Sequence, residues 1–303
     1  MATRRFAWVL NLDADLELAL PHGYTPKRTV LEAMKPYVAL LAGSLFGPED
    51  RLVDDSFAAL PASERATFTG RAFCPTPRAI AALRRAGVQP EAHPGVDVLR
   101  RVNSRAFSAS LGQTLPGASF VTDLEAARAV LGEPPPIGTG WRVKRNFGMT
   151  GRGQRIVLGA PDAGDVAFVS AGVVEGGVQI EPNLSIEAEF SIHGMLDVGF
   201  ASTLGVVVRQ LCDARGAWLA TERIASPTQH DLEMIAAVRA EAERVAVALG
   251  AARYHGPFGV DAYVYRSESG TLDIQLRSEI NARYSMGFAI GYLGRPEPRF
   301  PSR

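Results

Sequence analysis

The chain is poor in cysteine. Only Cys74 and Cys212 carry thiols among its 303 residues. Two isolated thiols make neither a disulfide framework nor a zinc site, which excludes the small disulfide-stapled domains and the cysteine-rich zinc modules. A reducing compartment is the plain interpretation of so few thiols, and we therefore expect a cytoplasmic protein.

The chain also lacks a net charge and a long apolar run. Lys and Arg together number 32, as do Asp and Glu, so the formal net charge is zero. Bulk charge therefore favours neither a nucleic acid nor an acidic membrane as a partner, although a local basic groove would leave the net charge unchanged. The first apolar run is soon interrupted by Asp13, Asp15 and Glu17, which argues against a signal peptide and a membrane span.

Several catalytic and nucleotide-binding signatures are missing as well. No persuasive Ser/His/Asp or Cys/His set is present, and the glycine-rich stretch FGMTGRGQ at 147–154 is followed by neither GK[ST] nor a helix pattern, so it is not a Walker A motif. What is present is an ordinary globular balance of 47% hydrophobic and 21% charged residues. The length permits two or three subdomains.

Helix-like and strand-like segments alternate over the first 95 residues. Residues 6–12 have the pattern of a buried strand, residues 25–45 that of a helix opened by Thr-Pro, and residues 77–90 that of a second helix with Gly87 as C-cap. This alternation predicts a small α/β layer unit, which we assign to residues 1–98.

The remainder of the chain has a different character. We expect a helix over 102–115, a strand and a helix over 115–132 with a cap at Thr122 or Asp123, and a Pro/Gly-rich break at 133–140. Farther along we expect a long helix that ends at Gly250 and, after it, a β-hairpin. The other segments after residue 140 have strand patterns. We therefore predict two α+β subdomains, at 99–180 and 181–303. The predicted strands are 141–146, 154–159, 165–172, 177–183, 185–194, 195–211 and 216–224, the helix is 230–250 and the hairpin is 258–281.

The hairpin carries the most informative polar residues. Glu279 and Asn281 are two residues apart on one strand and share a face, and Asp261 on the partner strand joins them if the register suits. Three oxygen donors at one place suit a hard cation such as Mg²⁺. Arg283, just past the strand, could meet a phosphate. The plainer alternative is that Glu279 pairs with a neighbouring arginine, Arg277 or Arg283, on a solvated face.

Two other segments could bind a nucleotide. A strand with Lys144 leads into the glycine-rich stretch, where Gly148, Gly151 and Gly153 let backbone N–H groups approach an anion; the alternative is a flexible hairpin. Farther on, the Glu181-Pro182 pair bends a strand and leaves backbone groups to meet a planar base.

Four charged residues accompany these segments. Glu189 follows the bend on the next strand, and Arg105 lies in a helix from which it could reach a phosphate, although an exposed helical arginine is the commoner case. Either Arg209 or Arg223 could hold a substrate carboxylate; we favour Arg209, with a surface role as its alternative.

The order of these features resembles that of the ATP-grasp superfamily. The chain presents, in this order, a cationic residue on a helix, a lysine on a strand followed by a glycine-rich loop, a glutamate-rich bend, a long helix, and a hairpin with Asp on one strand and Glu-x-Asn on the other. The resemblance covers about residues 100–290. Residues 1–95 look like the α/β pre-ATP-grasp domain. The resemblance implies the ATP-grasp fold, with this domain followed by two α+β subdomains that clamp ATP.

The resemblance also implies roles in nucleotide binding. Lys144 is similar to the lysine that contacts the α-phosphate, and Glu189 to the acid that binds the ribose hydroxyls. The loop residues Gly148, Gly151, Arg152 and Gly153 would close over the β- and γ-phosphates. The adenine would be read by Glu181 and by the backbone of Pro182, Asn183 and Leu184.

The metal site is implied in the same way. Asp261, Glu279 and Asn281 look like the ligands of two Mg²⁺ ions, a role that Mn²⁺ can also fill, and Arg283 resembles the residue that steadies the transferred phosphate. Two departures stand out. Arg105 occupies the helix position that usually carries a lysine, and the long stretch after Asp261 leaves Asp273 or Gln275 as alternative ligands.

The implied reaction joins a small-molecule carboxylate to an amine. The carboxylate attacks the γ-phosphate of ATP, and the amine then displaces phosphate from the acyl phosphate, so no protein nucleophile is needed. A kinase on the same scaffold and a non-catalytic ATP-binding regulator are the alternatives. Dimers are common in the superfamily, so the resemblance also admits a homodimer.

Overall fold

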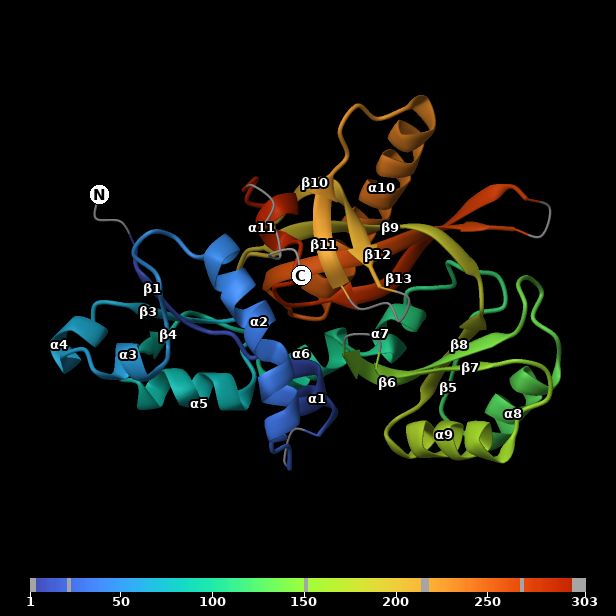
Figure 1. Cartoon of the computed structure of the whole chain (residues 1–303), viewed down its shortest axis with the longest axis horizontal. Helices are drawn as coiled ribbons and strands as arrows, with labels where there is room; N and C mark the ends of the chain where they lie inside the picture. The colour runs from blue at the N-terminus through green and yellow to red at the C-terminus, as the bar shows by residue number, and fades with distance from the viewer. Residues whose placement is uncertain (1–3, 21–22, 150–151, 214–217, 268–269, 296–303) are drawn as a thin grey trace.

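The computed structural model describes residues 4–20, 23–149, 152–213, 218–267 and 270–295, with no side chain described for Met149 and Arg152. Within these residues the chain forms three sheets, one after another along the sequence (Figure 1). No helix in the described ranges combines the length and the apolar character needed to cross a membrane.

The N-terminal sheet is parallel and confirms the predicted α/β unit. Its strand order is β2-β1-β3-β4. The helix α5 begins with proline at Pro77, and Gly87, at φ +76°, follows its end as predicted. The elements are β1 (Phe6–Val9), α1 (Ala14–Ala19), α2 (Arg28–Leu45), β2 (Arg51–Leu52), α3 (Asp55–Ala58), α4 (Ala62–Arg65), β3 (Thr69–Ala72), α5 (Pro77–Arg85) and β4 (Gln89–Pro90).

Two short helices replace the single helix predicted over 102–115. They are α6 (Val96–Val102) and α7 (Arg105–Ser110). The break falls at Ser104, whose hydroxyl accepts a hydrogen bond from the Phe107 backbone N–H and so caps α7. Arg105 therefore stands at the first position of α7, next to the small sheet.

The small sheet is antiparallel, in the order β5-β8-β6-β7. Its strands are β5 (Ser119–Val121), β6 (Trp141–Met149), β7 (Arg152–Val157) and β8 (Val178–Pro182). The helices α8 (Leu124–Gly132) and α9 (Ala163–Val174) cover one face, below the sheet in Figure 1, and share a core with β6, β7 and β8.

The strand predicted at 165–172 was wrong, because these residues belong to α9. A capping box starts the helix, in which Asp162 and Asp165 each accept a hydrogen bond from the other's backbone N–H. At the other end of this subdomain, β8 continues past the boundary that we predict at 180/181. Since β8 pairs only within the small sheet among the described strands, we propose Pro182 as the end of that subdomain.

The C-terminal sheet is antiparallel, in the order β11-β10-β9-β12-β13. It confirms the paired strands and the hairpin predicted from the sequence. Its strands are β9 (Ser185–Leu196), β10 (Ser202–Cys212), β11 (Trp218–Arg223), β12 (Gly256–Arg266) and β13 (Leu272–Asn281). The long helix α10 (Gln229–Ala251) runs past Gly250, and the left-handed residue after it is Arg253, at φ +65°.

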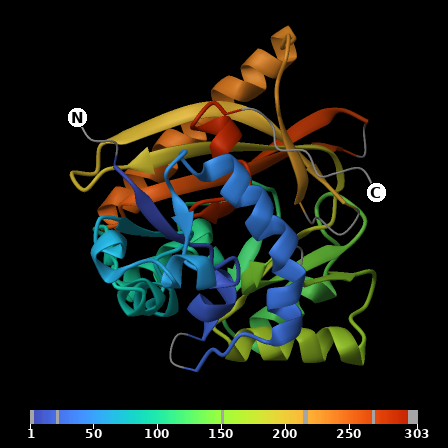
Figure 2. The same ribbon diagram turned by 60° about the vertical axis from the view of Figure 1, so that its left-hand side comes forward.

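The two faces of β12 differ in chemistry. Phe258, Val260 and Val264 point into the largest core cluster together with residues of α10. Because side chains alternate along a strand, Asp261 and Tyr263 point to the opposite face, toward the other two sheets. The short helix α11 (Phe288–Gly291) follows the hairpin and contacts α2 (Figure 2).

Candidate functional site

One cavity lies where the three sheets meet. It encloses about 280 Å³ and is lined from α1 and α2 of the N-terminal unit, from β6, β7 and β8 of the small sheet, and from all five strands of the C-terminal sheet. Eleven of the side chains or backbone positions predicted for the site line it, and these are Arg105, Lys144, Gly148, Glu181, Pro182, Leu184, Glu189, Asp261, Glu279, Asn281 and Arg283.

Asp261 and Glu279 are direct cross-strand neighbours. The register of β12 and β13 pairs Asp261 with Glu279 and Gly259 with Asn281. The amides of Asn281 and Gln210 each donate to one oxygen of the Asp261 carboxylate, at 2.8 Å. The long stretch between the strands therefore does not displace Asp261.

The two alternative ligands lie elsewhere. Asp273 pairs with Tyr265 near the turn end of the hairpin, is exposed, and accepts a hydrogen bond from the Tyr265 hydroxyl at 3.2 Å. Gln275 pairs with Tyr263 and is buried, but it does not line the cavity. An irregularity in the register separates Gln275 from Glu279, so the two are not equivalent positions on the strand.

The neighbouring Glu279 carboxylate perturbs Asp261. Burial and the negative charge of Glu279 raise the pKa of Asp261 to about 7, while the hydrogen bond from Gln210 opposes this shift. A bound cation would relieve the unfavourable effect of the Glu279 charge on the Asp261 carboxylate.

The donor set fits a hard divalent cation. Asp261 and Glu279 supply carboxylate oxygens and Asn281 supplies an amide, the oxygen ligands that Mg²⁺ prefers. Among the described residues, no group of three or more His, Cys, Asp or Glu side chains is arranged to hold a metal alone. That number of acids fits an ion that takes its remaining ligands from water and phosphate.

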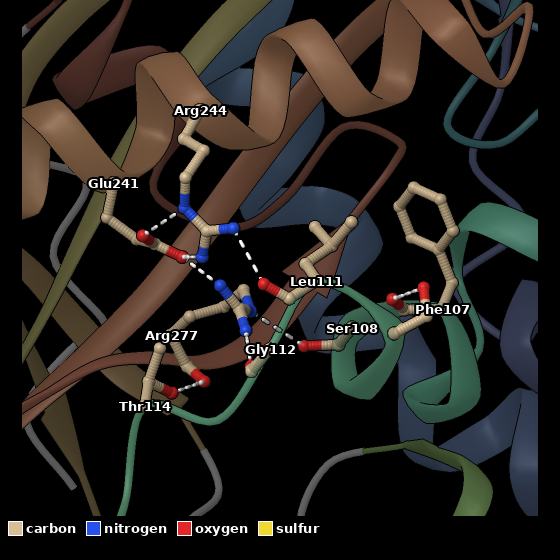
Figure 3. A network of polar contacts seen from close by, with 9 residues as sticks. Phe107, Ser108, Leu111, Gly112, Thr114, Glu241, Arg244 and Arg277 are labelled. Carbon is tan, nitrogen blue, oxygen red and sulfur yellow. Dashed lines mark hydrogen bonds and ion pairs between the residues drawn. The ribbon is translucent and has the colours of Figure 1, made fainter.

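Glu279 does not pair with either neighbouring arginine on its strand. Its carboxylate lies 3.1 Å from the Arg105 guanidinium, which also donates to the Arg145 carbonyl of β6 at 3.0 Å. Arg105 thus connects α7, the small sheet and β13. Arg277 instead points to Glu241 of α10, in a separate buried network (Figure 3).

Lys144 and Glu181 form a buried ion pair on the small sheet. The Lys144 ammonium lies 2.5 Å from the Glu181 carboxylate, and their side chains are 12% and 5% exposed. Arg142 lies two residues before Lys144 on β6, on the same face of the strand, and donates to Asn183 at 2.9 Å and to Gln154 at 3.1 Å. Arg142 and Gln154 line the cavity and were not predicted, whereas Asn183 does not line it.

The glycine-rich stretch connects β6 to β7. Gly148 lines the cavity. Gly153 has φ +80°, a conformation that favours glycine, and does not line the cavity. Gly151 lies outside the described residues, and Arg152 is placed only as the first residue of β7.

Glu189 has an unexpected partner. It accepts a hydrogen bond from the Cys212 thiol at 2.9 Å, and its register partners are Gln210 on β10 and Tyr263 on β12. Burial and the neighbouring Glu189 carboxylate hold the pKa of Cys212 well above its usual range. Cys212 is therefore a protonated donor at neutral pH.

Arg283 is anchored by the N-terminal unit. Its guanidinium donates to both carboxylate oxygens of Asp15 in α1, at 2.7 and 3.2 Å, and to the Tyr284 carbonyl at 3.2 Å. The paired Asp15 carboxylate raises the pKa of Arg283 further despite its burial. Asp15 was not predicted, because its partner lies 268 residues away in the sequence.

The structure does not bring Arg209 to the cavity. Gln210 lines it, and because successive side chains of a strand point to opposite faces, the preceding residue Arg209 points outward, where it is exposed. Six further lining residues that the sequence did not indicate are apolar and come from separate elements, while His193, Ser278 and Ser285 add polar groups. The six apolar residues are Leu12, Met34, Tyr37, Phe73, Trp218 and Met286.

Comparison with known proteins finds similar three-dimensional structures but no match by sequence. No family model matches the chain, and no curated protein matches its sequence. Solved structures do match. Biotin carboxylase from Campylobacter jejuni, in a β,γ-ATP complex, is 15% identical with a TM-score of 0.55, over 99% of this chain and 72% of that one.

Two further structures agree. The ADP complex of N5-carboxyaminoimidazole synthetase from Staphylococcus aureus is 14% identical with a TM-score of 0.50, over 93% of this chain and 71% of that one. Pyruvate carboxylase from Rhizobium etli, with acetyl coenzyme A, is 13% identical with a TM-score of 0.53, over 93% of this chain but 26% of that one. The chain therefore has the ATP-grasp fold, with a parallel N-terminal sheet followed by two antiparallel sheets.

Proposed function

We propose that the protein is an ATP-dependent ligase that joins a carboxylate to an amine. The observation that carries this proposal is the direct pairing of Asp261 with Glu279, with Asn281 beside them, in the cavity that also contains Lys144 and Glu181. The matched structures include an ATP complex and an ADP complex of other proteins, which supports a nucleotide in this cavity.

The nucleotide would lie against the small sheet. Lys144 would move from Glu181 toward a phosphate, which leaves the Glu181 carboxylate and the adjoining backbone to meet the adenine amino group. Glu189 would accept from the ribose hydroxyls while Cys212 holds its other oxygen. These side chains bind and orient ATP, and positioning of this kind supplies much of the rate in phosphoryl transfer.

Asp261, Glu279 and Asn281 would hold Mg²⁺. When bound, Mg²⁺ would offset the charge of the phosphate oxygens during transfer. Arg105 would keep Glu279 in place, because it pairs with that carboxylate and is fixed to the Arg145 carbonyl. Arg283, held by Asp15, presents its guanidinium near the transferred group.

The reaction proceeds in two displacements. A carboxylate oxygen of the substrate attacks the γ-phosphorus, and the bond from that phosphorus to the ADP oxygen breaks. The amine nitrogen then attacks the acyl carbon, phosphate leaves with the electron pair of the carbon–oxygen bond, and the nitrogen loses a proton. The chain would contribute binding and charge and would form no covalent bond to either substrate.

Phosphate release from ATP and Mg²⁺, measured with pools of amino acids and small carboxylic acids, tests the proposal. Release should require an acid and an amine together, and Glu279→Gln should lower it on the order of a hundredfold. Asp273→Asn is the matched control, since it removes an exposed carboxylate from the same strand outside the cavity and should leave the rate unchanged.

Product mass separates the alternatives. A ligase product has lost water relative to its two substrates, whereas a kinase product has gained a phosphate. ATP binding without turnover on any acid or amine would instead favour a regulatory role. Full activity in Glu279→Gln would show that Glu279 is not a ligand of the metal on which the reaction depends.

A further inference from the structure

The cavity has two chemically different ends. The end beside the small sheet is polar, with Arg142, Lys144 and Glu181. The end beside the N-terminal unit is mostly apolar, although Asp15, His193 and Ser285 also line it, and its apolar lining comes from the segment before α1, from α2, from the residue after β3, from β11 and from the segment after β13. These apolar residues are Leu12, Met34, Tyr37, Phe73, Trp218 and Met286.

The apolar residues at this end are packed against other parts of the protein. Met34, Phe73 and Trp218 are 8%, 4% and 8% exposed, and the ring centroids of Tyr37 and Trp218 lie 6.4 Å apart. The Trp218 indole N–H donates to the Thr221 hydroxyl at 2.8 Å, so the polar atom of the ring is already bonded. What these residues turn toward the cavity is therefore chiefly hydrocarbon and aromatic surface.

Arg283 fixes how a substrate would lie relative to this surface. Its guanidinium carbon is 5.4 Å from the centroid of the Phe73 ring, and Met286 follows it by three residues. The bonds to Asp15 and Tyr284 leave N–H groups of the five-donor fork for an incoming carboxylate. A carboxylate at Arg283 would therefore place its substituent among the apolar residues.

We propose that the carboxylate substrate carries a bulky apolar group, which packs against Phe73, Trp218 and Met286. This inference rests on the proposed function, because it assumes that the carboxylate beside Arg283 is the group that is phosphorylated. An acidic substituent would lose much of its hydration against this lining, in which Ser285 and the neutral His193 are uncharged polar groups and Asp15 is already paired with Arg283. The apolar residues thus select the acid, and the polar end binds the nucleotide.

The test replaces the unknown amine with hydroxylamine, which captures acyl phosphates as hydroxamates. With ATP and Mg²⁺, 3-phenylpropanoate and hexanoate should give hydroxamate with a kcat/KM at least about tenfold above that of succinate and acetate. Met286→Gln should lower kcat/KM about tenfold for 3-phenylpropanoate and leave that for acetate within about twofold. Leu219→Gln is the control, since Leu219 is an exposed apolar residue of β11 that does not line the cavity.

The outcomes separate the inference from the function on which it rests. Hydroxamate formation that favours succinate, or an equal loss for both acids in Met286→Gln, would overturn the inference and leave the ligase proposal standing. Hydroxamate from no acid would count against the ligase proposal. Equilibrium dialysis of labelled 3-phenylpropanoate then decides the inference alone: binding that Met286→Gln weakens supports it, and absence of binding overturns it.

Discussion

The buried charge network of Arg277 offers a direct test of what holds the subdomains together. Arg277 of β13 pairs with Glu241 of α10, and their side chains are 2% and 8% exposed. Arg277 also donates to the Gly112 carbonyl and, at 3.2 Å, to the Ser108 hydroxyl, which fixes the segment between α7 and the small sheet (Figure 3). Burial lowers the pKa of Arg277 even though Glu241 opposes the shift.

Replacing Glu241 with Gln leaves the Arg277 charge buried without its counter-ion. Loss of one partner of a buried pair costs about 3–5 kcal/mol, a large share of the roughly 5–15 kcal/mol that stabilises a folded domain. Arg244 donates to the same carboxylate at 2.7 and 2.9 Å but is 47% exposed. Its ion pair is therefore worth about 1 kcal/mol or less, and Arg244→Ala is the matched control.

Urea unfolding followed by circular dichroism measures both losses, and hydrogen exchange of residues 108–114 locates them. The pair Glu241→Leu with Arg277→Met should be less destabilising than the sum of the two single changes, because no buried charge remains unpaired and the exposed Arg244 is solvated. If Glu241→Gln cost no more than Arg244→Ala, Arg277 would not depend on Glu241 and the reasoning would fail.

Three further predictions concern groups near the cavity. A Cβ at Gly291 would lie 2.6 Å from Nδ1 of His193, so Gly291→Ala should destabilise by about 1–3 kcal/mol in thermal or urea unfolding, whereas Gly43→Ala in α2, with nothing within 4 Å, should not. Burial lowers the pKa of His193 from 6.5 to about 3, so on acidification the unfolded chain binds a proton before the folded chain does. The free energy of unfolding should therefore fall by about 2 kcal/mol between pH values above 6.5 and pH 5, as urea unfolding at each pH measures. The fall should be smaller in His193→Gln, which has no imidazole at this position. Cys212 should react with iodoacetamide at pH 8 at least about tenfold more slowly in the folded chain than in urea, and buried Cys74 should be protected too; rapid folded-state labelling of Cys212 would contradict its raised pKa.

Local sequence rules predicted which side chains of the hairpin share a face at Asp261, Glu279 and Asn281, but they did not predict the directions of Arg277 and of the side chains of β10. The two-residue period of a strand put Glu279 and Asn281 on one face, and the observed register placed Asp261 opposite Glu279. The same period did not predict that Arg277 turns to α10, because an irregularity in the register intervenes. Nor did it show which face of β10 is inward, which is why Arg209 was chosen instead of Gln210.

Other features depend on contacts that no short stretch encodes. Residues 165–172 have the apolar content of either a buried strand or a helix, and the capping box at Asp162 and Asp165 was the local signal that favours α9. Asp15 and Phe73 come from the N-terminal unit, and only the packing of that unit on the C-terminal sheet brings them to Arg283. Their roles therefore required the three-dimensional structure.

The Asp15–Arg283 pair has a consequence for biosynthesis. Its partners are separated by 268 residues, and nearby the Tyr284 backbone N–H donates to the Phe73 carbonyl. A ribosome that adds about 5–20 residues per second needs many seconds to produce both halves. During that interval the N-terminal sheet can fold, but Asp15 remains a carboxylate without this guanidinium. The cavity can therefore be completed only after Arg283 has been synthesised, and a nascent chain that stops before Arg283 would lack one side of it.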